Sequence, residues 1–185
     1  MSYHRFYGNA AERRKWQNPD SILASIGLNL GFTFADVGCG SGFFSIPAAK
    51  IVGKKGKVFA LDSDEEAIAA LRKKAFTKNL TNIEARVGTA EDTVLCDACA
   101  DMVFFGIVLH DFNDPALVLV NARKMLKPEG RLVDLDWKKE SMDFGPPIDI
   151  RFSEERAIGL IEGAGFKVER QEESGRFHYI IVARR

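Results

Sequence analysis

Long apolar runs are absent from this sequence. The longest one, 102–109, falls far short of the roughly 20 apolar residues that a helix needs to cross a bilayer. The first residues, MSYHRFYGNAAERRKW, contain no apolar core of signal-peptide length. From these two absences we expect neither a membrane-spanning helix nor a secretory leader, and therefore a cytoplasmic protein with no membrane partner.

A net charge is also missing. The 26 lysines and arginines are balanced by 26 aspartates and glutamates, and 46% of the residues are hydrophobic. Proteins that bind nucleic acid through its phosphates need a basic field, so we expect no nucleic-acid partner. The composition is ordinary for one globular domain, and it gives no indication of the oligomeric state.

Cysteine is scarce. An odd set of three, Cys39, Cys96 and Cys99, argues against a disulfide framework. Cys96 and Cys99 form a lone CxxC, which without a second pair or a neighbouring histidine does not make a zinc or redox site. We therefore expect the thiols to be structural and the protein to hold no metal.

What the sequence does contain is an apolar strand that ends in a glycine-rich turn, FADVGCGSGFF, at 34–44. Gly38, Gly40 and Gly42 give the backbone freedom to turn sharply, and a largely apolar helical segment follows at 43–52. A strand, a glycine turn and a helix start bring free N–H groups to one place, as in nucleotide sites of α/β proteins. The glycine pattern alone does not identify the ligand.

Two acids narrow the choice of ligand. Asp36 lies inside the motif, where a fixed negative charge would repel a pyrophosphate and favours a cationic ligand. The apolar run 57–61 predicts the next strand, and it ends in Asp62, about 20 residues past the last glycine. An acid at that distance accepts hydrogen bonds from ribose hydroxyls.

The rest of the chain alternates between predicted helices and strands. Asn18 and Pro19 begin a helix that stops at Gly27, and a capping box at 63–66 begins another. The apolar face of the second helix has its members at helical spacing: Ile68, Leu71, Ala75 and Phe76. Further strands are expected at 83–87, 101–105, 131–136, 167–173 and 177–183.

This alternation predicts an α/β, doubly wound fold with a mostly parallel sheet covered by helices on both faces. The last two strands are separated by only Ser174, Gly175 and Arg176. So short a link permits an antiparallel hairpin but no crossover helix.

Two segments fall outside the alternation. The segment 3–16 mixes aromatic and cationic residues, which fits either a solvated helix with one packed edge or a flap over the ligand. In the flap, Arg13 or Arg14 would meet a carboxylate. The connection 138–152 contains Gly-Pro-Pro and no helical period, and long irregular connections of this kind tend to be functional.

These motifs together resemble those of class I S-adenosylmethionine-dependent methyltransferases. The stretch 36–42 resembles their first motif and 58–62 the second, and the resemblance continues through 88–92, 108–111 and 126–132. It is closest to the small-molecule branch that includes the ubiquinone and menaquinone biosynthesis methyltransferases. It implies a seven-stranded Rossmann-like methyltransferase fold in a single domain, 1–185, with 1–17 as a possible N-terminal flap and 18–185 as the cofactor-binding core.

The resemblance implies S-adenosylmethionine as cofactor, S-adenosylhomocysteine as product and a small organic or lipid-like molecule as acceptor. It places Asp36 and the Gly38 carbonyl near the amino group of the methionine end. In the adenine loop, Thr89 stands where Asp is common, so Glu91 or Asp92 is expected to supply the carboxylate. The implied cofactor-binding residues are Asp36, Gly38, Cys39, Gly40, Ser41, Gly42, Phe43, Asp62, Ser63, Thr89, Ala90, Glu91 and Gly106.

A sulfonium already activates its methyl group, so such an enzyme mainly aligns the acceptor and excludes water. Ala90 is expected to offer its N–H to adenine, and Gly106 to let the substrate approach the backbone. His110 follows the fourth strand at the carboxyl edge, where ligands bind. It is our candidate catalytic residue, as a general base, although a histidine there also fits a helix start that caps or faces solvent.

Two other function classes remain open from the residues alone. One is a non-catalytic protein that binds S-adenosylmethionine for a regulatory or partner role. The other is a nicotinamide-dependent enzyme, against which Asp36 argues. Asp134 and Asp136 share one face of a predicted strand, but two acids do not make a metal cluster of the catechol-methylating type.

Overall fold

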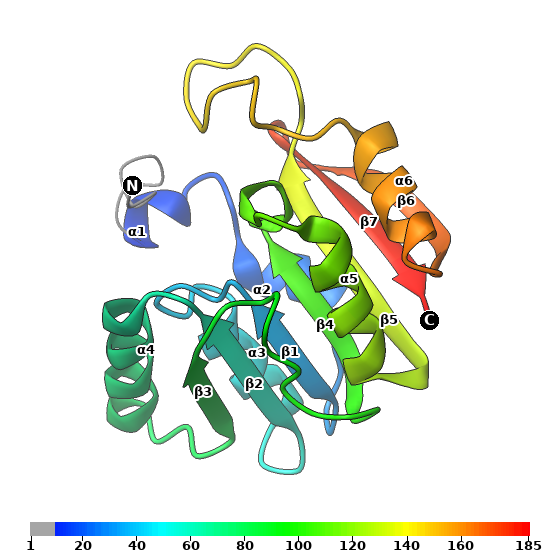
Figure 1. Ribbon diagram of the computed structural model, residues 1–185. Helices are drawn as coiled ribbons and strands as arrows, with labels where there is room; N and C mark the ends of the chain where they lie inside the picture. Colours follow the sequence, from blue (N-terminus) through cyan, green and yellow to red (C-terminus); the bar gives the residue numbers. More distant parts are fainter. Residues whose placement is uncertain (1–9) are drawn as a thin grey trace.

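A seven-stranded sheet forms the centre of the protein in a computed structural model, which describes residues 10–185 (Figure 1). The strands lie in the order β3-β2-β1-β4-β5-β7-β6. Their bounds are β1 Thr33–Val37, β2 Lys57–Asp62, β3 Ile83–Val87, β4 Ala100–Gly106, β5 Leu126–Trp137, β6 Lys167–Ser174 and β7 His178–Arg184. β7 runs antiparallel to β5 and β6, and all other neighbours are parallel. The predicted mostly parallel sheet with a C-terminal hairpin is confirmed.

Helices cover both faces of this sheet, as expected for parallel strands that are apolar on both sides. One face carries α2, α3 and α4, and the other carries α5 and α6. A short helix and a 3-10 turn lie outside these layers. The bounds are α1 Ala10–Arg13, α2 Pro19–Ser25, α3 Ser45–Val52, α4 Glu65–Thr77, η2 Leu109–Asp111, α5 Pro115–Met125 and α6 Glu154–Gly163.

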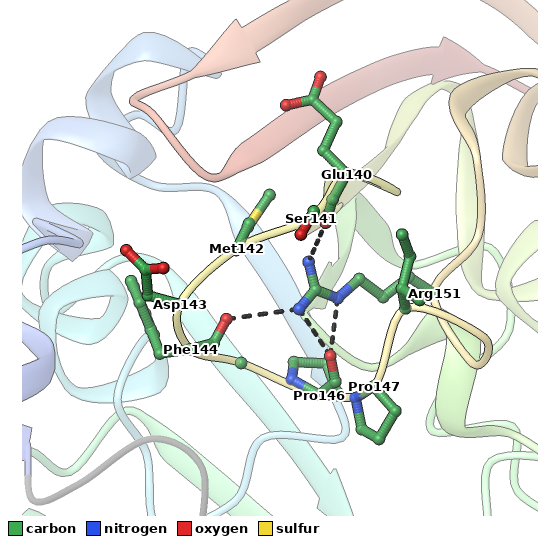
Figure 2. A pocket seen from close by; sticks show the side chains of 10 residues that line it. Glu140, Ser141, Met142, Asp143, Phe144, Pro146, Pro147 and Arg151 are labelled. Carbon is green, nitrogen blue, oxygen red and sulfur yellow. Dashed lines mark hydrogen bonds between the residues drawn. The ribbon is translucent and has the colours of Figure 1, made fainter.

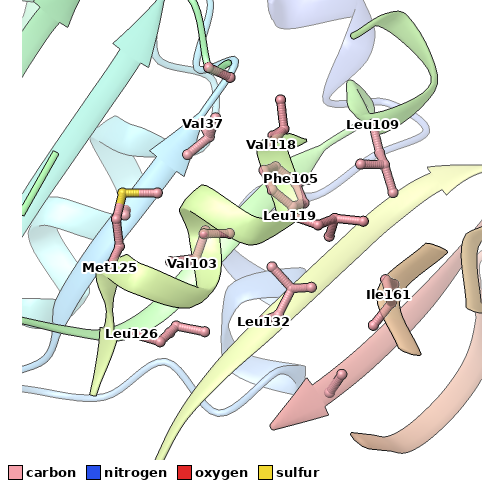
Figure 3. Packing of buried hydrophobic residues seen from close by; sticks show 14 of the residues in the cluster. Val37, Val103, Phe105, Leu109, Val118, Leu119, Met125, Leu126, Leu132 and Ile161 are labelled. Atoms are coloured by element: carbon pink, nitrogen blue, oxygen red, sulfur yellow. The ribbon is translucent and has the colours of Figure 1, made fainter. Parts of the chain in front are cut away.

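Side chains alternate between the two faces along each strand, which divides the core into two apolar layers. Phe34 and Phe104 pack their rings 5.6 Å apart on the α2 and α3 side. Val103, Phe105 and Leu132 lie on the opposite side, beneath α5 and α6 (Figure 3). The sheet is thus fixed from both faces, and its carboxyl edge is held in a defined position.

Helix α4 differs from its prediction at both ends. Its N-cap is Asp64, whose carboxylate accepts the N–H groups of Glu66 and Ala67, so the predicted cap at Ser63 was wrong by one residue. The reason is that Asp62 accepts the N–H of Asp64 and keeps Ser63 in the preceding turn. Phe76 is 85% exposed, because α4 packs at the β3 edge of the sheet and buries only a narrow stripe.

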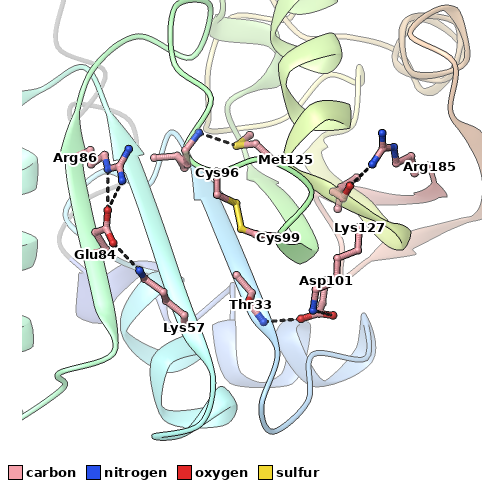
Figure 4. Close-up of a disulfide and its surroundings, with 12 residues drawn as sticks. Thr33, Lys57, Glu84, Arg86, Cys96, Cys99, Asp101, Met125, Lys127 and Arg185 are labelled. Carbon is pink, nitrogen blue, oxygen red and sulfur yellow. Dashed lines mark hydrogen bonds and ion pairs between the residues drawn. A yellow bond between two sulfur atoms is a disulfide. The ribbon is translucent and has the colours of Figure 1, made fainter.

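A disulfide joins Cys96 and Cys99, so the expectation of free structural thiols was wrong for this pair (Figure 4). The turn that carries them is hydrogen-bonded to the end of α5. Ala98 has a left-handed backbone (φ 44°) and donates to the Lys124 carbonyl, and Cys99 donates to the Met125 carbonyl. These contacts bring the Cα atoms of Cys96 and Cys99 to within 5.9 Å of each other, a distance that permits a disulfide. The CxxC spacing in the sequence does not by itself predict this distance.

Within residues 10–185, every helix is too short or too polar to cross a membrane. The same part of the chain contains no group of three or more histidine, cysteine or acidic side chains placed to hold a metal ion.

Candidate active site

The glycine turn after β1 has a left-handed backbone at each predicted glycine, with φ values of 75°, 51° and 86° at Gly38, Gly40 and Gly42. A Cβ on Gly38 would lie 2.5 Å from Val108, and one on Gly42 would lie 2.4 Å from Leu71. These two glycines therefore let the turn pack against the β4 loop and α4. Gly40 has open space on its Cβ side, which leaves room for a ligand.

Asp62 closes this turn from the end of β2. One carboxylate oxygen accepts the Gly40 N–H at 2.7 Å, and the other accepts the Asp64 N–H at 2.9 Å. Each carboxylate oxygen offers two lone pairs, so both retain capacity to accept further hydrogen bonds. The neighbouring Ser63 is exposed. The glycine turn and the predicted ribose acceptor are thus one hydrogen-bonded unit.

Lys74 of α4 holds the same turn from the other side. Its ammonium donates to the Ser41 carbonyl at 2.8 Å and to the Ser41 hydroxyl at 2.9 Å. Partial burial lowers the pKa of Lys74. The sequence analysis missed this residue, because its partner lies 33 residues away and no local motif marks the contact.

Asp36 is buried at the start of the turn, with 1% of its surface exposed, and the Ser45 hydroxyl donates to it at 2.5 Å. The pKa of Asp36 is raised to about 7: burial is the largest cause, the Ser45 hydrogen bond lowers the pKa, the charge of Asp62 raises it and that of Arg13 lowers it. A carboxyl group with that pKa changes charge in the neutral range. A cationic ligand beside it would favour the ionised form.

Arg13 reaches this region from the N-terminal segment. Its guanidinium lies 4.1 Å above the centre of the Phe43 ring, and it is close enough to Asp36 to lower the pKa of that acid. Arg14 instead forms an exposed ion pair with Asp20 at 3.1 Å. Both guanidinium groups lie over the Phe43 ring, Arg14 at 5.5 Å from its centre, and Arg13 is the one that lowers the pKa of Asp36.

Cys39 is the one free thiol among the described residues and is buried in the turn. Its Sγ donates to the Gly40 carbonyl at 3.4 Å. Burial, followed by the charges of Asp36 and Asp62, raises the pKa of this thiol. Cys39 therefore contributes packing and backbone N–H geometry, not a thiolate.

The predicted adenine loop after β3 is held by contacts within the protein. The Thr89 hydroxyl donates to Asp92 at 2.8 Å, and Glu91 accepts backbone N–H groups that precede α5. Asn121 of α5, which the sequence analysis missed, donates to the carbonyls of Ala90 and Glu91 at 3.1 and 2.6 Å. Both candidate carboxylates therefore already have partners in this structure, and Ala90 is buried.

The chain takes an unusual path where β4 ends. A Cβ on Gly106 would lie 2.7 Å from the ring of Phe104 and 2.9 Å from that of Phe44. The absence of a side chain at Gly106 therefore allows these two rings to pack, and on that side it does not open space for a substrate. Ile107 follows with φ 65°, a strained value for a β-branched residue. Strained backbone of this kind clusters at functional sites, and this one directly precedes the histidine turn.

His110 lies in η2 with its ring buried against β5. Its Nδ1 is 2.8 Å from both carboxylate oxygens of Asp136, and Asp136 also accepts the Trp137 N–H. Its Nε2 is 3.3 Å from Asp111 and has no hydrogen-bond partner among the described residues. Burial lowers the pKa of His110, but Asp136 and then Asp111 outweigh burial and raise it overall.

Four rings from separate segments form an aromatic cluster: Trp16, Trp137, Phe144 and His178. The Trp16 ring lies 5.4 to 5.7 Å from each of the others and stacks on His178. Burial and three nearby cations lower the pKa of His178 to about 3. His178 is therefore neutral at physiological pH, and the cluster joins the N-terminal segment to the ends of β5 and β7.

The connection 138–152 is folded around one buried guanidinium (Figure 2). Arg151 is 3% exposed and donates to the carbonyls of Pro146, Glu140 and Phe144 at distances from 2.6 to 3.3 Å. The connection surrounds a cavity of about 310 Å³. This long irregular segment therefore has a defined shape beside the aromatic cluster.

Comparison with known proteins agrees with this geometry. The sequence model of a family described as "Methyltransferase domain" matches residues 28–154. Demethylmenaquinone methyltransferase of Bacillus subtilis is 28% identical over 131 residues, which are 71% of this chain and 55% of that protein. The chain spans about half, or less, of the length of the curated relatives it matches.

Two solved structures show the same architecture. A SAM-dependent methyltransferase from Aquifex aeolicus superposes with a TM-score of 0.88 at 33% identity, over 92% of this chain and 91% of that one. The [4+2]-cyclase SpnF superposes with a TM-score of 0.80 at 15% identity, over 100% of this chain and 88% of that one. The second similarity concerns the fold alone, and it indicates that this fold does not by itself fix the reaction.

Proposed function

Because this chain belongs to the S-adenosylmethionine-dependent methyltransferases, we propose that it transfers a methyl group to a small organic or lipid-like acceptor. The observation that carries the proposal is the unit formed by the glycine turn and Asp62 at the ends of β1 and β2. We call the carboxyl edge at β1, β2 and β3 the cofactor half of the site, and the edge at β4, β5 and β7 the acceptor half.

The residues of the cofactor half fit S-adenosylmethionine. Gly40 offers open space, Asp62 retains lone pairs for ribose hydroxyls, and Asp36 supplies a buried acid for a cationic group. Ala90 lies in the loop where adenine is expected. When bound, S-adenosylmethionine would supply the activated methyl group, and S-adenosylhomocysteine would be the product left in the cofactor half.

The aromatic cluster in the acceptor half favours a flat or lipid-like molecule as the methyl acceptor. The aromatic cluster brings Trp16 of the N-terminal segment onto the ends of β5 and β7. We propose that residues 10–17 form part of a flap that excludes water; residues 1–9 of the predicted flap lie outside the described part of the chain. The curated relative from Bacillus subtilis is named for methylation of demethylmenaquinone, which is consistent with such an acceptor.

His110 is the proposed general base of the acceptor half. Asp136 accepts from Nδ1 and so fixes the tautomer in which Nε2 carries the lone pair. Nε2 is the ring atom that has no hydrogen-bond partner among the described residues, although Asp111 lies 3.3 Å from it. It is therefore the atom proposed to take the proton that a hydroxyl or acidic carbon of the acceptor loses.

The experiment has two steps, both on the full chain. Calorimetry with S-adenosylhomocysteine should show binding, and Asp62→Ala should weaken it by roughly 1 to 3 kcal/mol through loss of hydrogen bonds. Cell extract incubated with methyl-labelled S-adenosylmethionine should then yield a labelled small molecule by mass spectrometry.

No binding by well-folded protein would remove the proposal. Binding without any labelled product, across extracts and an acceptor panel, would instead assign the non-catalytic S-adenosylmethionine-binding role that the sequence left open. Competition between NAD and S-adenosylhomocysteine tests the nicotinamide alternative, which predicts that NAD binds more tightly.

A further inference from the structure

We infer that Asp134 is held as a neutral acid next to Asp136 on β5, so that of these two carboxyl groups only Asp136 carries a negative charge beside the His110 ring. The inference rests on the proposed function, because a base at His110 is what gives this charge state a role. It assigns different charges to two aspartates that lie two residues apart on one strand.

Both aspartates point to the same face of β5. They occupy alternate positions of the strand, and on the neighbouring β7 they pair with Ile181 and Tyr179. Leu132, at the preceding alternate position, packs in the layer beneath α5 and α6. The two carboxyl groups therefore lie in the apolar layer between the sheet and these helices.

Their hydrogen bonds differ completely. Asp136 is bonded to the His110 ring and to the Trp137 N–H. Asp134 is 0% exposed, and among the described residues neither of its oxygens has a hydrogen-bond partner. An ionised carboxylate without partners in an apolar layer is so costly that the group takes up a proton instead. Burial, and then the charge of Asp136, raise the pKa of Asp134 well above its usual value.

Among residues 10–185, the one charged group that shifts the pKa of Asp134 is Asp136, and no cation does so. Tyr179 is neutral, since burial and then the acids Asp134, Asp136 and Glu154 raise the pKa of its hydroxyl. Asp111 faces Nε2 of His110 from η2, and Arg151 lowers the pKa of His110 from the connection 138–152. The proton on Asp134 therefore decides whether one or both of the two β5 carboxyl groups are negatively charged.

The number of negative charges beside the imidazole affects its ability to act as a base. A second carboxylate beneath the imidazole would favour the imidazolium form, which has no lone pair to accept the acceptor's proton. With Asp134 neutral, Asp136 is the one β5 carboxylate that adds negative charge beside the ring, in addition to Asp111 of η2, which lies 3.3 Å from Nε2.

The direct test is an NMR titration of the His110 ring in the full chain, without cofactor or acceptor. The sequence contains three histidines, and His110→Gln assigns the signal. Asp136→Asn should lower the pKa of His110 by about one unit or more, because it removes an adjacent negative charge. Asp134→Asn, its matched control of the same size, should leave that pKa nearly unchanged. A shift with Asp134→Asn as large as that with Asp136→Asn would overturn the inference.

A second measurement needs no variant. Carboxyl carbon spectra of protein labelled at aspartate should show, besides the Asp36 signal that titrates near pH 7, an acid that is still protonated well above pH 7, and Asp134→Asn should remove that second signal where the variant folds. If every aspartate other than Asp36 is ionised at neutral pH, the inference is wrong. None of these readouts depends on methyl transfer, so a failed activity assay would count against the proposed function alone.

The pH dependence of the rate separates positioning from a purely structural role. Asp136→Asn should move the acid limb of the kcat profile to lower pH together with the pKa of His110, while Asp134→Asn should leave the limb in place. An acid limb that moves equally in both variants would also overturn the inference.

Discussion

The two halves of the carboxyl edge are built in different ways. The cofactor half is shaped by backbone: three left-handed glycines, and N–H groups of the turn that bond to Asp62 and to the Leu61 carbonyl. The acceptor half is shaped by side chains from distant segments, which meet in the His110–Asp136 pair and the aromatic cluster. A site that is shaped by backbone conformation tolerates few substitutions. A site that is shaped by side chains can acquire a different ligand through substitution of single residues.

The largest effect is expected at Gly38 in the cofactor half. Gly38→Ala combines a left-handed φ with a Cβ 2.5 Å from Val108, so we expect a stability loss of about 2 kcal/mol or more and no measurable binding of S-adenosylhomocysteine. Denaturant unfolding and calorimetry measure the two effects. Gly159→Ala is the control: it lies inside α6 with open space and should be neutral or stabilising. Equal effects of the two substitutions would contradict a backbone-built cofactor half.

The charge of Asp36 should make cofactor binding depend on pH. With a pKa of about 7 in the free protein, Asp36 must lose its proton to meet the ammonium group of S-adenosylhomocysteine, so affinity should fall about tenfold per pH unit below 7. Calorimetry between pH 5.5 and 8.5 measures this, and Asp36→Asn should give weaker binding that does not vary with pH. An affinity of the wild-type protein that is flat over this range would refute the assignment.

Stability should depend on the same group with the opposite sign. The folded pKa of Asp36 lies above its unfolded value of about 3.9, so the stability it contributes is full below that value and is lost as pH rises through about 7. Urea unfolding at several pH values, compared with Asp36→Asn, shows whether the loss occurs. No difference in slope between the two proteins would contradict the raised pKa.

Lys74 should have a smaller effect, because it acts on the turn and not on the ligand. Lys74→Met removes two hydrogen bonds to Ser41 and should weaken binding of S-adenosylhomocysteine by about 1 kcal/mol. The neighbouring Lys73 is exposed, so Lys73→Met should leave the affinity unchanged. If both variants bind equally well, the contact does not support the turn.

The smallest effect on cofactor affinity is expected from the acceptor half. Trp16→Leu removes a ring whose ring contacts are with the other members of the aromatic cluster. We expect the Kd of S-adenosylhomocysteine to stay within about twofold, while KM for the acceptor rises about tenfold through lost packing. A tenfold loss of cofactor affinity would show that the two halves are not separable.

Sequence reasoning succeeded where the determining contacts are local. The strands, the left-handed glycine turn and the cap at Asn18 follow from residues within one element and its flanking turn. It failed at the exposed Phe76, since helical spacing does not show how narrow the covering surface is. It also failed at the Cys96–Cys99 disulfide, which depends on hydrogen bonds between its turn and α5.

The sequence by itself determined the order of strands and helices and the left-handed glycine turn after β1. These features are set by backbone conformation and side-chain alternation within a few residues. Only the tertiary structure decided that Lys74 holds Ser41, that Asp136 orients His110 and that Arg151 shapes the connection beside the aromatic cluster. Such contacts depend on the register of packed elements, which no short stretch of sequence encodes.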